Sequence, residues 1–227
     1  MAFAGLIVVV ATLVAGAAYL RYQAQQKRRA ALFVVANGLG FQYSAEDPNA
    51  TIGLPFALFG RGDGRGIDDV MWGDHEHVPM RLFDYWYYDE SSDSRGNRSR
   101  RYHRFTCAAL TIAADCPTLR IGHEGFFSRV GNTLGFKDME LEYEDFNREF
   151  RVRCEDQQFG FSLLDGRMME WLLKMRSIET IEVVGPFVLL ATGKLQPEKW
   201  TALARVAGEF HAHIPHVVWT TWPRGSA

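Results

Sequence analysis

The sequence is poor in cysteine and has almost no net charge. Its three cysteines, Cys107, Cys116 and Cys154, are an odd number without C-x-x-C spacing, which argues against a disulfide framework and against a paired-thiol zinc site. We interpret them as small core residues in a reducing compartment. A formal charge of −2 over 227 residues provides no large field of one sign, so nucleic acid is not expected as a partner.

The sequence also lacks the familiar catalytic signatures. It contains no G-x-S-x-G, no H-E-x-x-H and no P-loop lysine. Four alternating glycines resemble a phosphate-binding loop: Gly60, Gly62, Gly64 and Gly66. However, no strand leads directly into them, no helix follows, and Asp63 puts a negative charge where phosphate would lie. Nucleotide binding is therefore disfavoured.

A short polar turn carries the best candidate metal ligands. His75 and His77 are two residues apart, so on a strand their imidazoles would point to the same side, next to Asp74 and Glu76. The residues fall in a turn and no distant third ligand is marked, so a solvated turn is the preferred interpretation. We predict no catalytic residue, no cofactor and no metal site.

A long uncharged run begins the chain. Nineteen residues from Ala2 to Leu20 carry no charged side chain. At about 1.5 Å per residue, a helix of this length covers roughly the 30 Å hydrocarbon core of a bilayer. A cleaved signal peptide would need basic residues before the apolar run, and none precede it. We predict a single transmembrane helix over residues 1–20, with the lipid bilayer as a partner.

Basic residues follow the apolar run. The four cations are Arg21, Lys27, Arg28 and Arg29, and no acidic residue occurs before Glu46. The positive-inside rule places such a flank in the cytoplasm, so we expect a single-pass cell-membrane protein with a cytoplasmic C-terminal domain. Near anionic headgroups each cation would contribute about 1 kcal/mol, and we predict these four as membrane-surface residues. Topology alone would also explain them, and it is the simpler interpretation.

The rest of the chain divides into four predicted parts. The juxtamembrane segment over residues 21–40 contains a basic helix from Arg21 to Asn37, with Gly38 just past its end. It is followed by a linker over 41–66, an α+β domain over 67–213 and a partly ordered, exposed tail over 214–227. Strand-like runs precede interleaved helical ones, which predicts a mostly antiparallel sheet with helices packed on one side. Asp165 is expected to cap one helix and Pro197 to begin the last.

Three local expectations complete this description. Glu124–Gly135 is expected to form a short helix, two strand runs are expected around Glu144 and Asp145, and Gly185-Pro186 is expected to turn a β-hairpin.

Five aromatic residues occur within six positions between Phe83 and Tyr88. In a strand they would alternate, with Phe83, Tyr85 and Tyr87 on one side and Leu82, Asp84, Trp86 and Tyr88 on the other. Acidic residues of this strand are expected to pair with arginines of the returning strand, at roughly 0.2–1 kcal/mol per pair. The expected groups are Asp84, Asp89 and Glu90 with Arg98, Arg100, Arg101 and Arg104. A platform for stacking bases would leave its cations free for phosphate, so it is disfavoured.

Several segments together resemble a known family. They read LPFALFGRGDGR, MRLFDYWYYDE, RRYHRFTCAAL, CPTLRIG and FNREFRVRCEDQQFGFSLLDGRMMEWLL. Over about residues 30–193 the chain is similar to a family of uncharacterised bacterial single-pass membrane-anchored proteins. The resemblance implies an N-terminal anchor, a small α+β domain and no catalytic residue to transfer.

Two classes of function remain open. The first is a non-enzymatic module at the inner face of the membrane that binds a lipid headgroup or a protein partner of unspecified identity, which the basic flank and the lack of a catalytic set favour. The second is a hydrolase or small-ligand-binding enzyme that uses Asp84, Asp156 and Asp165 in one cleft. If the three carboxylates lie together in one cleft, the enzyme hypothesis is favoured; if they are dispersed, the binding module is favoured.

Overall fold

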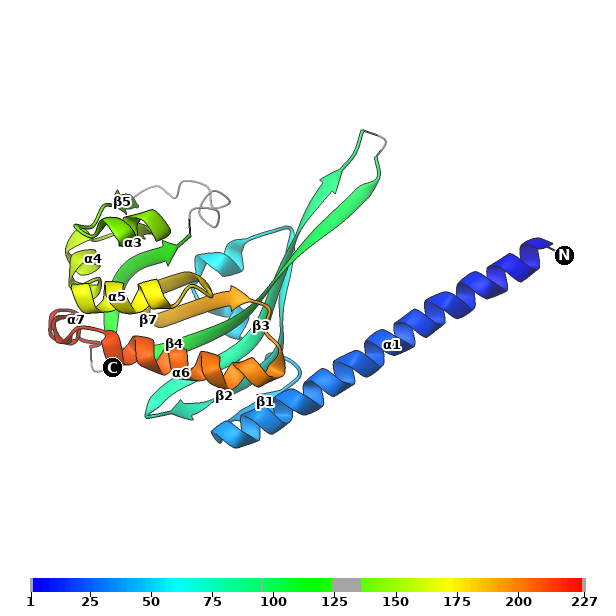
Figure 1. The fold of residues 1–227 in the computed structure, drawn as a ribbon, viewed down its shortest axis with the longest axis horizontal. Helices are drawn as coiled ribbons and strands as arrows, with labels where there is room; N and C mark the ends of the chain where they lie inside the picture. Colours follow the sequence, from blue (N-terminus) through cyan, green and yellow to red (C-terminus); the bar gives the residue numbers. More distant parts are fainter. Residues whose placement is uncertain (1, 95, 124–135, 226–227) are drawn as a thin grey trace.

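One long helix begins the chain. The computed structural model describes residues 2–94, 96–123 and 136–225, with side chains in the first helix from Thr12 onward. Helix α1 spans Ala2–Leu39, so the two predicted N-terminal segments form one continuous 38-residue helix that projects from the domain (Figure 1). Within the part whose side chains are described, no helix has the length and hydropathy needed to cross a membrane.

Helix α1 ends at a glycine. The amide of Gly40 donates to the carbonyl of Asn37 at 3.1 Å, and the amide of Phe41 donates to the carbonyl of Ala36 at 2.8 Å. This is a Schellman motif, which requires a left-handed residue after the last helical one. Gly40, with φ of 72°, supplies it, so the prediction that Gly38 has this role is wrong.

Seven strands form one sheet in which every pairing among the described residues is antiparallel. They are β1 (Gln42–Ser44), β2 (Gly64–His75), β3 (Val78–Ser92), β4 (Arg98–Gly122), β5 (Lys137–Met139), β6 (Arg151–Cys154) and β7 (Ile178–Gly193). The order is β1-β2-β3-β4-β6-β5, and β7 pairs with β4. Because residues 105–110 of β4 pair with β3 and β7 at once, these two strands flank β4.

The remaining helices are short. They are α3 (Glu144–Glu149), α4 (Gln157–Leu163), α5 (Gly166–Lys174), α6 (Trp200–His213) and α7 (His216–Thr221), with 3-10 turns η1 (Thr51–Gly53), η2 (Ala57–Gly60) and η3 (Pro197–Lys199). Asp165 caps α5 by accepting a hydrogen bond from the Met168 amide, and Pro197 begins the turn that leads into α6, so both predictions are confirmed.

The two faces of the sheet bury separate cores. On one face, Leu82, Leu110 and Ile112 pack with residues of α1, α4, α5 and α6, including Leu32 and Trp200. The other face buries a smaller cluster whose residues come mainly from η2 and strands β3, β4 and β7: Phe56, Leu58, Phe59, Phe83, Tyr85, Tyr87, Phe105, Cys107, Ala109, Leu189 and Ala191. The predicted α+β fold, with helices packed on a mostly antiparallel sheet after an N-terminal helix, is confirmed.

The structure bears on three local expectations and corrects one of them. Gly185 and Pro186 do not turn a hairpin: they lie inside the 16-residue strand β7, where Gly185 has φ of 55° at an irregularity in the pairing with β4. Strands β5 and β6 lie on either side of Glu144 and Asp145, as expected, and these two residues begin helix α3. The tail, expected to be partly ordered and exposed, contains α7 and is mostly exposed, although its Val218 is fully buried. The helix expected over Glu124–Gly135 lies outside the described residues.

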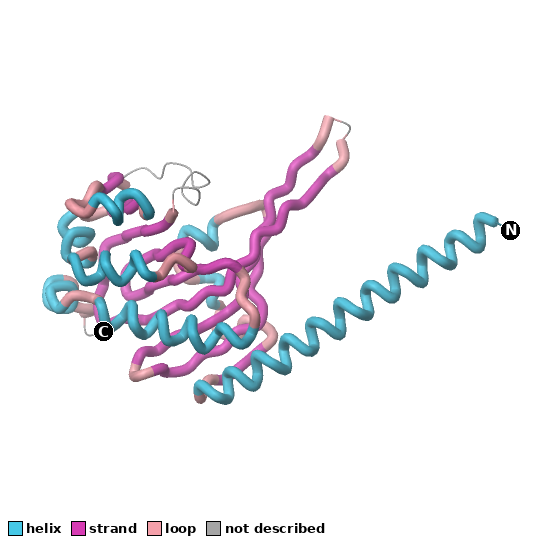
Figure 2. Tube along the Cα trace, viewed as in Figure 1, coloured by secondary structure: helices cyan, strands magenta, loops and turns pink. Residues whose placement is uncertain are grey.

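Strands β3 and β4 continue beyond the sheet as a two-stranded arm (Figure 2). Their pairing reaches Ser92 and Arg98, whereas the pairing of β2 with β3 stops at Tyr88 and that of β7 with β4 stops at Phe105. Among the described residues, both outer edges of the arm are therefore left without a neighbouring strand. Between residues 41 and 66, the predicted linker, the chain forms β1, η1, η2 and the start of β2.

Candidate functional site

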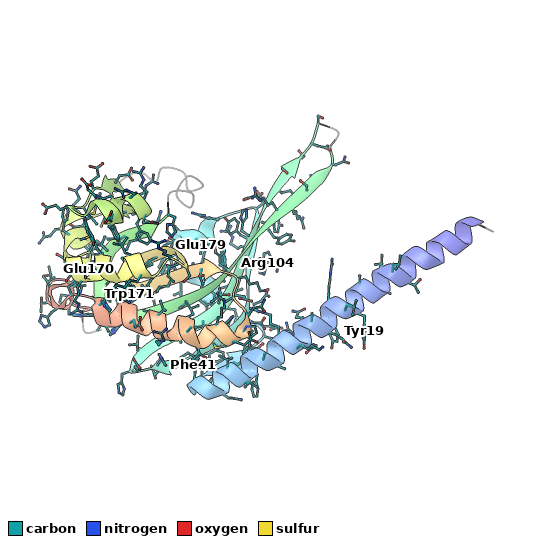
Figure 3. All side chains as sticks on the ribbon, viewed as in Figure 1. Tyr19, Phe41, Arg104, Glu170, Trp171 and Glu179 are labelled. Atoms are coloured by element: carbon teal, nitrogen blue, oxygen red, sulfur yellow. The ribbon has the colours of Figure 1, made fainter. Side chains whose placement is uncertain are left out.

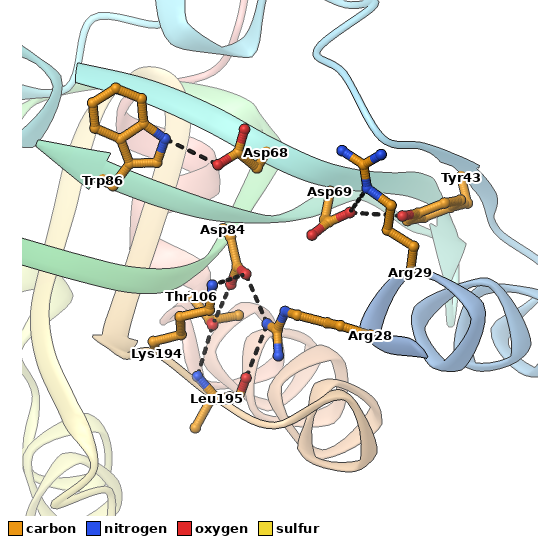
Figure 4. A network of polar contacts seen from close by, with 10 residues as sticks. All are labelled: Arg28, Arg29, Tyr43, Asp68, Asp69, Asp84, Trp86, Thr106, Lys194 and Leu195. Carbon is orange, nitrogen blue, oxygen red and sulfur yellow. Dashed lines mark hydrogen bonds and ion pairs between the residues drawn. The ribbon is translucent and has the colours of Figure 1, made fainter. Parts of the chain in front are cut away.

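A buried carboxylate joins α1 to the sheet. Asp84 points from β3 to the helix-covered face, and its side chain is only 4% exposed. It accepts hydrogen bonds from Arg28 of α1 at 2.7 Å and from the hydroxyl of Thr106 on β4 at 2.8 Å. The ammonium of Lys194 lies 3.1 Å away (Figure 4). Two cations thus offset the cost of burying one carboxylate, which would be large without a partner.

The same network fixes the chain that leads into α6. Arg28 also donates to the carbonyl of Leu195 at 3.0 Å, and the Leu195 amide donates to the Thr106 hydroxyl at 2.9 Å. The Arg28 guanidinium lies 6.0 Å from the centre of the Trp200 ring, within cation–π range. One arginine of α1 therefore contacts β3, the segment after β7 and α6 at once.

A second acidic residue, Asp69, holds the next arginine. The pairing of β2 with β3 is irregular between Asp68 and Met71, which is a β-bulge, and Asp69 has φ of 53° there. Tyr43 of β1 donates its hydroxyl to Asp69 at 2.7 Å, and Arg29 lies 3.6 Å from the same oxygen. Burial, and to a smaller extent the nearby Asp84 carboxylate, raises the pKa of Asp69.

The four predicted membrane-surface residues separate into two pairs in the structure. Arg21 and Lys27 are exposed. Arg28 and Arg29 are partly buried, with side chains 16% and 33% exposed, and each is engaged with an aspartate of the sheet. The sequence shows all four as one basic flank, and nothing local in it marks which two meet acids far along the chain.

The structure does not join the three carboxylates of the enzyme hypothesis in one network. Asp156 accepts hydrogen bonds from the Gln158 and Phe159 amides and caps α4, just as Asp165 caps α5. Asp84 is instead neutralised by Arg28 and Lys194, and not by the arginines across the arm with which we expected it to pair. Helix capping accounts for two of the three residues without catalysis.

The cysteines do not provide a nucleophile either. All three are buried and free of disulfides, which confirms their prediction as core residues. Burial raises the pKa of Cys107, and it raises the pKa of Cys116 to about 12 and that of Cys154 to about 11. Thiols whose pKa lies this far above neutral pH are protonated and therefore unreactive at neutral pH. Among the residues that the structure describes, no group of three metal-ligating side chains gathers, and Asp74–His77 remain at the turn between β2 and β3.

The predicted aromatic alternation is confirmed. Phe83, Tyr85 and Tyr87 lie in the smaller core, where the Tyr85 hydroxyl donates to the Leu58 carbonyl at 2.9 Å. Trp86 and Tyr88 lie on the opposite face, with ring centres 6.3 Å apart and planes 12° apart. Tyr102, across from Tyr88 on β4 and 46% exposed, completes this group at the base of the arm.

The alternating glycines provide space for these rings. A Cβ at Gly64 would lie 2.5 Å from the Tyr88 ring, and one at Gly66 would lie 2.6 Å from the Trp86 ring. Gly62 has φ of 71°, and a Cβ there would lie 2.6 Å from the Tyr88 carbonyl. The signal was present in the sequence as two alternations, one of glycines and one of aromatics. Only the β2–β3 register shows that they match.

Some of the charge pairs that we predicted between the two strands of the arm are present. Glu90 pairs with Arg98 at 3.3 Å and Arg100 at 3.0 Å, both on the exposed surface. Asp89, opposite Arg101 in the register, contacts His103 at 3.0 Å instead. Exposed pairs of this kind contribute little to stability, so they hold the arm's conformation only weakly.

A buried glutamate fastens the opposite face of the sheet. Glu182 of β7 is 2% exposed and accepts hydrogen bonds from the amides of Ala57 and Leu58 at 2.7 and 2.9 Å. Burial raises the pKa of Glu182, while Arg120, 3.6 Å away on β4, opposes the shift. These bonds keep η2 over the smaller core, so this carboxylate also has a structural role.

The geometry is that of an α+β domain fastened to the end of a long projecting helix. Neither the models of known protein families nor the curated proteins give a match to this sequence. Among solved structures, the chain is similar to the mycobacterial trehalose monomycolate transport factor A, TtfA, with a TM-score of 0.61 and 13% sequence identity. The match covers 88% of this chain and 97% of that one, and at this identity it shows a shared fold.

Proposed function

We propose that the chain is a bacterial single-pass membrane protein whose α+β domain is a non-enzymatic, lipid-binding module at the inner face of the membrane. The observation that carries the proposal is the division of α1. Its C-terminal part is built into the domain through Arg28, Leu32 and Ala36, whereas the uncharged run from Ala2 to Leu20 leads away from it. A helix anchored at one end and apolar at the other suits a domain held close to a bilayer.

The orientation is also part of the proposal. Arg21 and Lys27 are exposed just after the apolar run, and the positive-inside rule would keep them, and the domain behind them, in the cytoplasm. Buried protonated thiols agree with a reducing compartment. Membership of the family of bacterial membrane-anchored proteins that the sequence resembles belongs to the same proposal.

The lipid part of the proposal draws on the shared fold. TtfA is described as a transport factor for trehalose monomycolate, which is a lipid. We extend to this chain only the general property, contact between the domain and lipid headgroups. The capping roles of Asp156 and Asp165 favour binding over hydrolysis.

Anchoring is tested with the full chain carrying a C-terminal tag in bacterial cells. We expect the tag to sediment with membranes, to resist alkaline extraction and to survive protease added outside spheroplasts until they are lysed. Val9→Arg and Leu13→Arg would each raise the free energy of membrane insertion by about 2.5–3.5 kcal/mol. The double variant V9R/L13R should therefore move to the soluble fraction. The matched V9A/L13A variant should remain in the membrane. Digestion of the tag in intact spheroplasts would contradict the orientation.

Lipid binding is tested with photo-crosslinkable phospholipid in vesicles that contain the full chain. We expect cross-links in the domain beyond residue 40 in addition to those in α1. Cross-links confined to α1 would leave an anchor without a lipid-binding domain.

A further inference from the structure

We infer that the β3–β4 arm is a second membrane contact, in which a strip of aromatic and arginine side chains lies among the phospholipid headgroups of the bilayer that α1 enters. The strip consists of Trp86, Tyr88, Arg100, Tyr102 and Arg104. The inference rests on the proposed function, because it requires α1 to be in the membrane.

The strip is a continuous surface on one face of the arm. The ring centres of Trp86 and Tyr102 are 5.9 Å apart, and those of Tyr88 and Tyr102 are 5.3 Å apart. Arg100 lies 4.6 Å over the Tyr88 ring and Arg104 lies 5.4 Å over the Tyr102 ring. Amphipathic rings beside cations are the side chains that membrane–water interfaces favour.

The strip lies on the same face of the sheet as α1. Asp84, which binds Arg28 of α1, is two residues before Trp86 on β3, and alternate residues of a strand share a face. From Asp84 to Tyr88 the strand advances about 13 Å. From Arg28 back to Arg21, where the apolar run ends, α1 advances about 10 Å. The strip and the start of the proposed membrane segment are therefore at comparable distances from one shared contact.

The arm and α1 also point the same way. Both project to the same side of the domain in Figure 1, in a view that shows the two longest dimensions of the molecule. Figure 3 shows Arg104 of the arm and Tyr19 of α1 on that side, and Glu170 of α5 on the opposite side. A bilayer entered by α1 would thus face the arm and not α5.

Charge favours an anionic surface. Residues 86–104 contain five arginines and three acidic residues, although the whole chain has a formal charge of −2. Within the strip, Arg100 pairs with Glu90 at 3.0 Å, whereas Arg104 has no carboxylate within ion-pair distance in the described part of the chain. Basic side chains near anionic lipid gain favourable energy, so the arm is suited to headgroups such as phosphatidylglycerol.

Ring geometry disfavours single-stranded nucleic acid. Bases bind by stacking on open aromatic faces. Here Arg100 and Arg104 lie over Tyr88 and Tyr102, and Trp86 lies beside both rings. Such a packed group offers ring edges and cations, which match a headgroup layer better than a row of bases.

The experiment uses the full chain in vesicles of phosphatidylglycerol and phosphatidylcholine that contain a headgroup-quencher lipid. A fluorophore is placed on one new cysteine at a time: Ser99→Cys on the arm outside the strip, Tyr22→Cys on α1, or Glu170→Cys on α5. The three native cysteines are buried and compete little for the label. We expect quenching at positions 22 and 99 but not at 170. In the S99C background, Arg100→Ala and Arg104→Ala should each lower arm contact about five-fold, as should pure phosphatidylcholine.

The three label positions distinguish failure of the arm contact from failure of the proposed membrane anchor. Quenching at position 22 without quenching at 99 overturns the arm contact and leaves the anchor intact. Absence of quenching at 22 contradicts the proposed function, and the inference with it. Capture of a labelled single-stranded oligonucleotide that depends on Arg100 and Arg104, with position 99 unquenched, assigns the arm to nucleic acid and also overturns the inference.

Discussion

The Arg28 guanidinium donates to the Asp84 carboxylate at 2.7 Å, across 56 residues of sequence, and this bond ties the N-terminal helix to the centre of the sheet. Because the same arginine contacts the Leu195 carbonyl, movement of α1 would disturb the segment leading into α6.

Loss of this pair should destabilise the domain. Arg28→Gln leaves Asp84 buried with Lys194 and Thr106 alone, so we expect the free energy of unfolding to fall by about 3 kcal/mol. Urea unfolding of the full chain in detergent, followed by tryptophan fluorescence, measures the change. Arg21→Gln, at an exposed position of the same helix, should stay within about 0.5 kcal/mol of the unsubstituted protein.

A double-mutant cycle separates the pair from the rest of the network. In an Asp84→Asn background, Arg28→Gln should cost at least about 1 kcal/mol less than it does alone, because the carboxylate that it leaves unpaired is gone. Equal costs in the two backgrounds would mean that Arg28 acts through its other contacts.

Gly66 should tolerate no side chain while Trp86 is present. A Cβ would lie 2.6 Å from the indole, so we expect Gly66→Ala to lower the free energy of unfolding by about 1–3 kcal/mol. Gly60→Ala is the matched control, since nothing lies within 4 Å of a Cβ at that position. In a Trp86→Ala background the Gly66→Ala cost should largely disappear, and thermal unfolding of the four variants checks this.

Asp69 should make stability depend on pH. Burial raises its pKa above the ordinary value of 3.8, so between 3.8 and the folded-state pKa the folded protein binds more protons than the unfolded one. The contribution of this residue therefore becomes less favourable as pH rises through that window. We expect Asp69→Asn to remove this slope, since an amide oxygen still accepts the Tyr43 hydroxyl bond.

Unfolding measured from pH 4 to pH 7 tests the expectation for Asp69. The stability difference between Asp69→Asn and the unsubstituted protein should grow in favour of the variant as pH rises. Asp145→Asn, at a side chain that is 67% exposed, should leave the difference flat. A flat difference for both variants would contradict the assigned pKa direction.

The three thiols should react only after unfolding. Because burial raises the pKa of Cys107, Cys116 and Cys154, a water-soluble disulfide reagent at pH 8 should modify none of them within minutes in the folded protein. All three should react in urea. Rapid modification of one thiol without denaturant would show that its segment opens readily.

The sequence predicted the features that are encoded by neighbouring residues. The alternation of Phe83 to Tyr88, the cap at Asp165 and the helix start at Pro197 each depend on a few adjacent positions, and the structure bears them out. Composition and the order of strand-like and helical runs were sufficient for the α+β fold. The hairpin turn predicted at Gly185-Pro186 is absent. A glycine beside a proline favours a turn, but the pairing with the long strand β4 keeps β7 continuous.

The sequence by itself determined that α1 ends close to residue 40, which strand faces are apolar and that the thiols are core residues. Only the tertiary structure decided that Arg28 and Arg29 meet Asp84 and Asp69, and that Gly64 and Gly66 provide space for Tyr88 and Trp86. The physical reason is the sequence separation of the contacting residues. Helical and strand periodicity arise from contacts a few residues apart, but a buried ion pair or a ring packed against a glycine depends on strand register and on how a helix crosses the sheet.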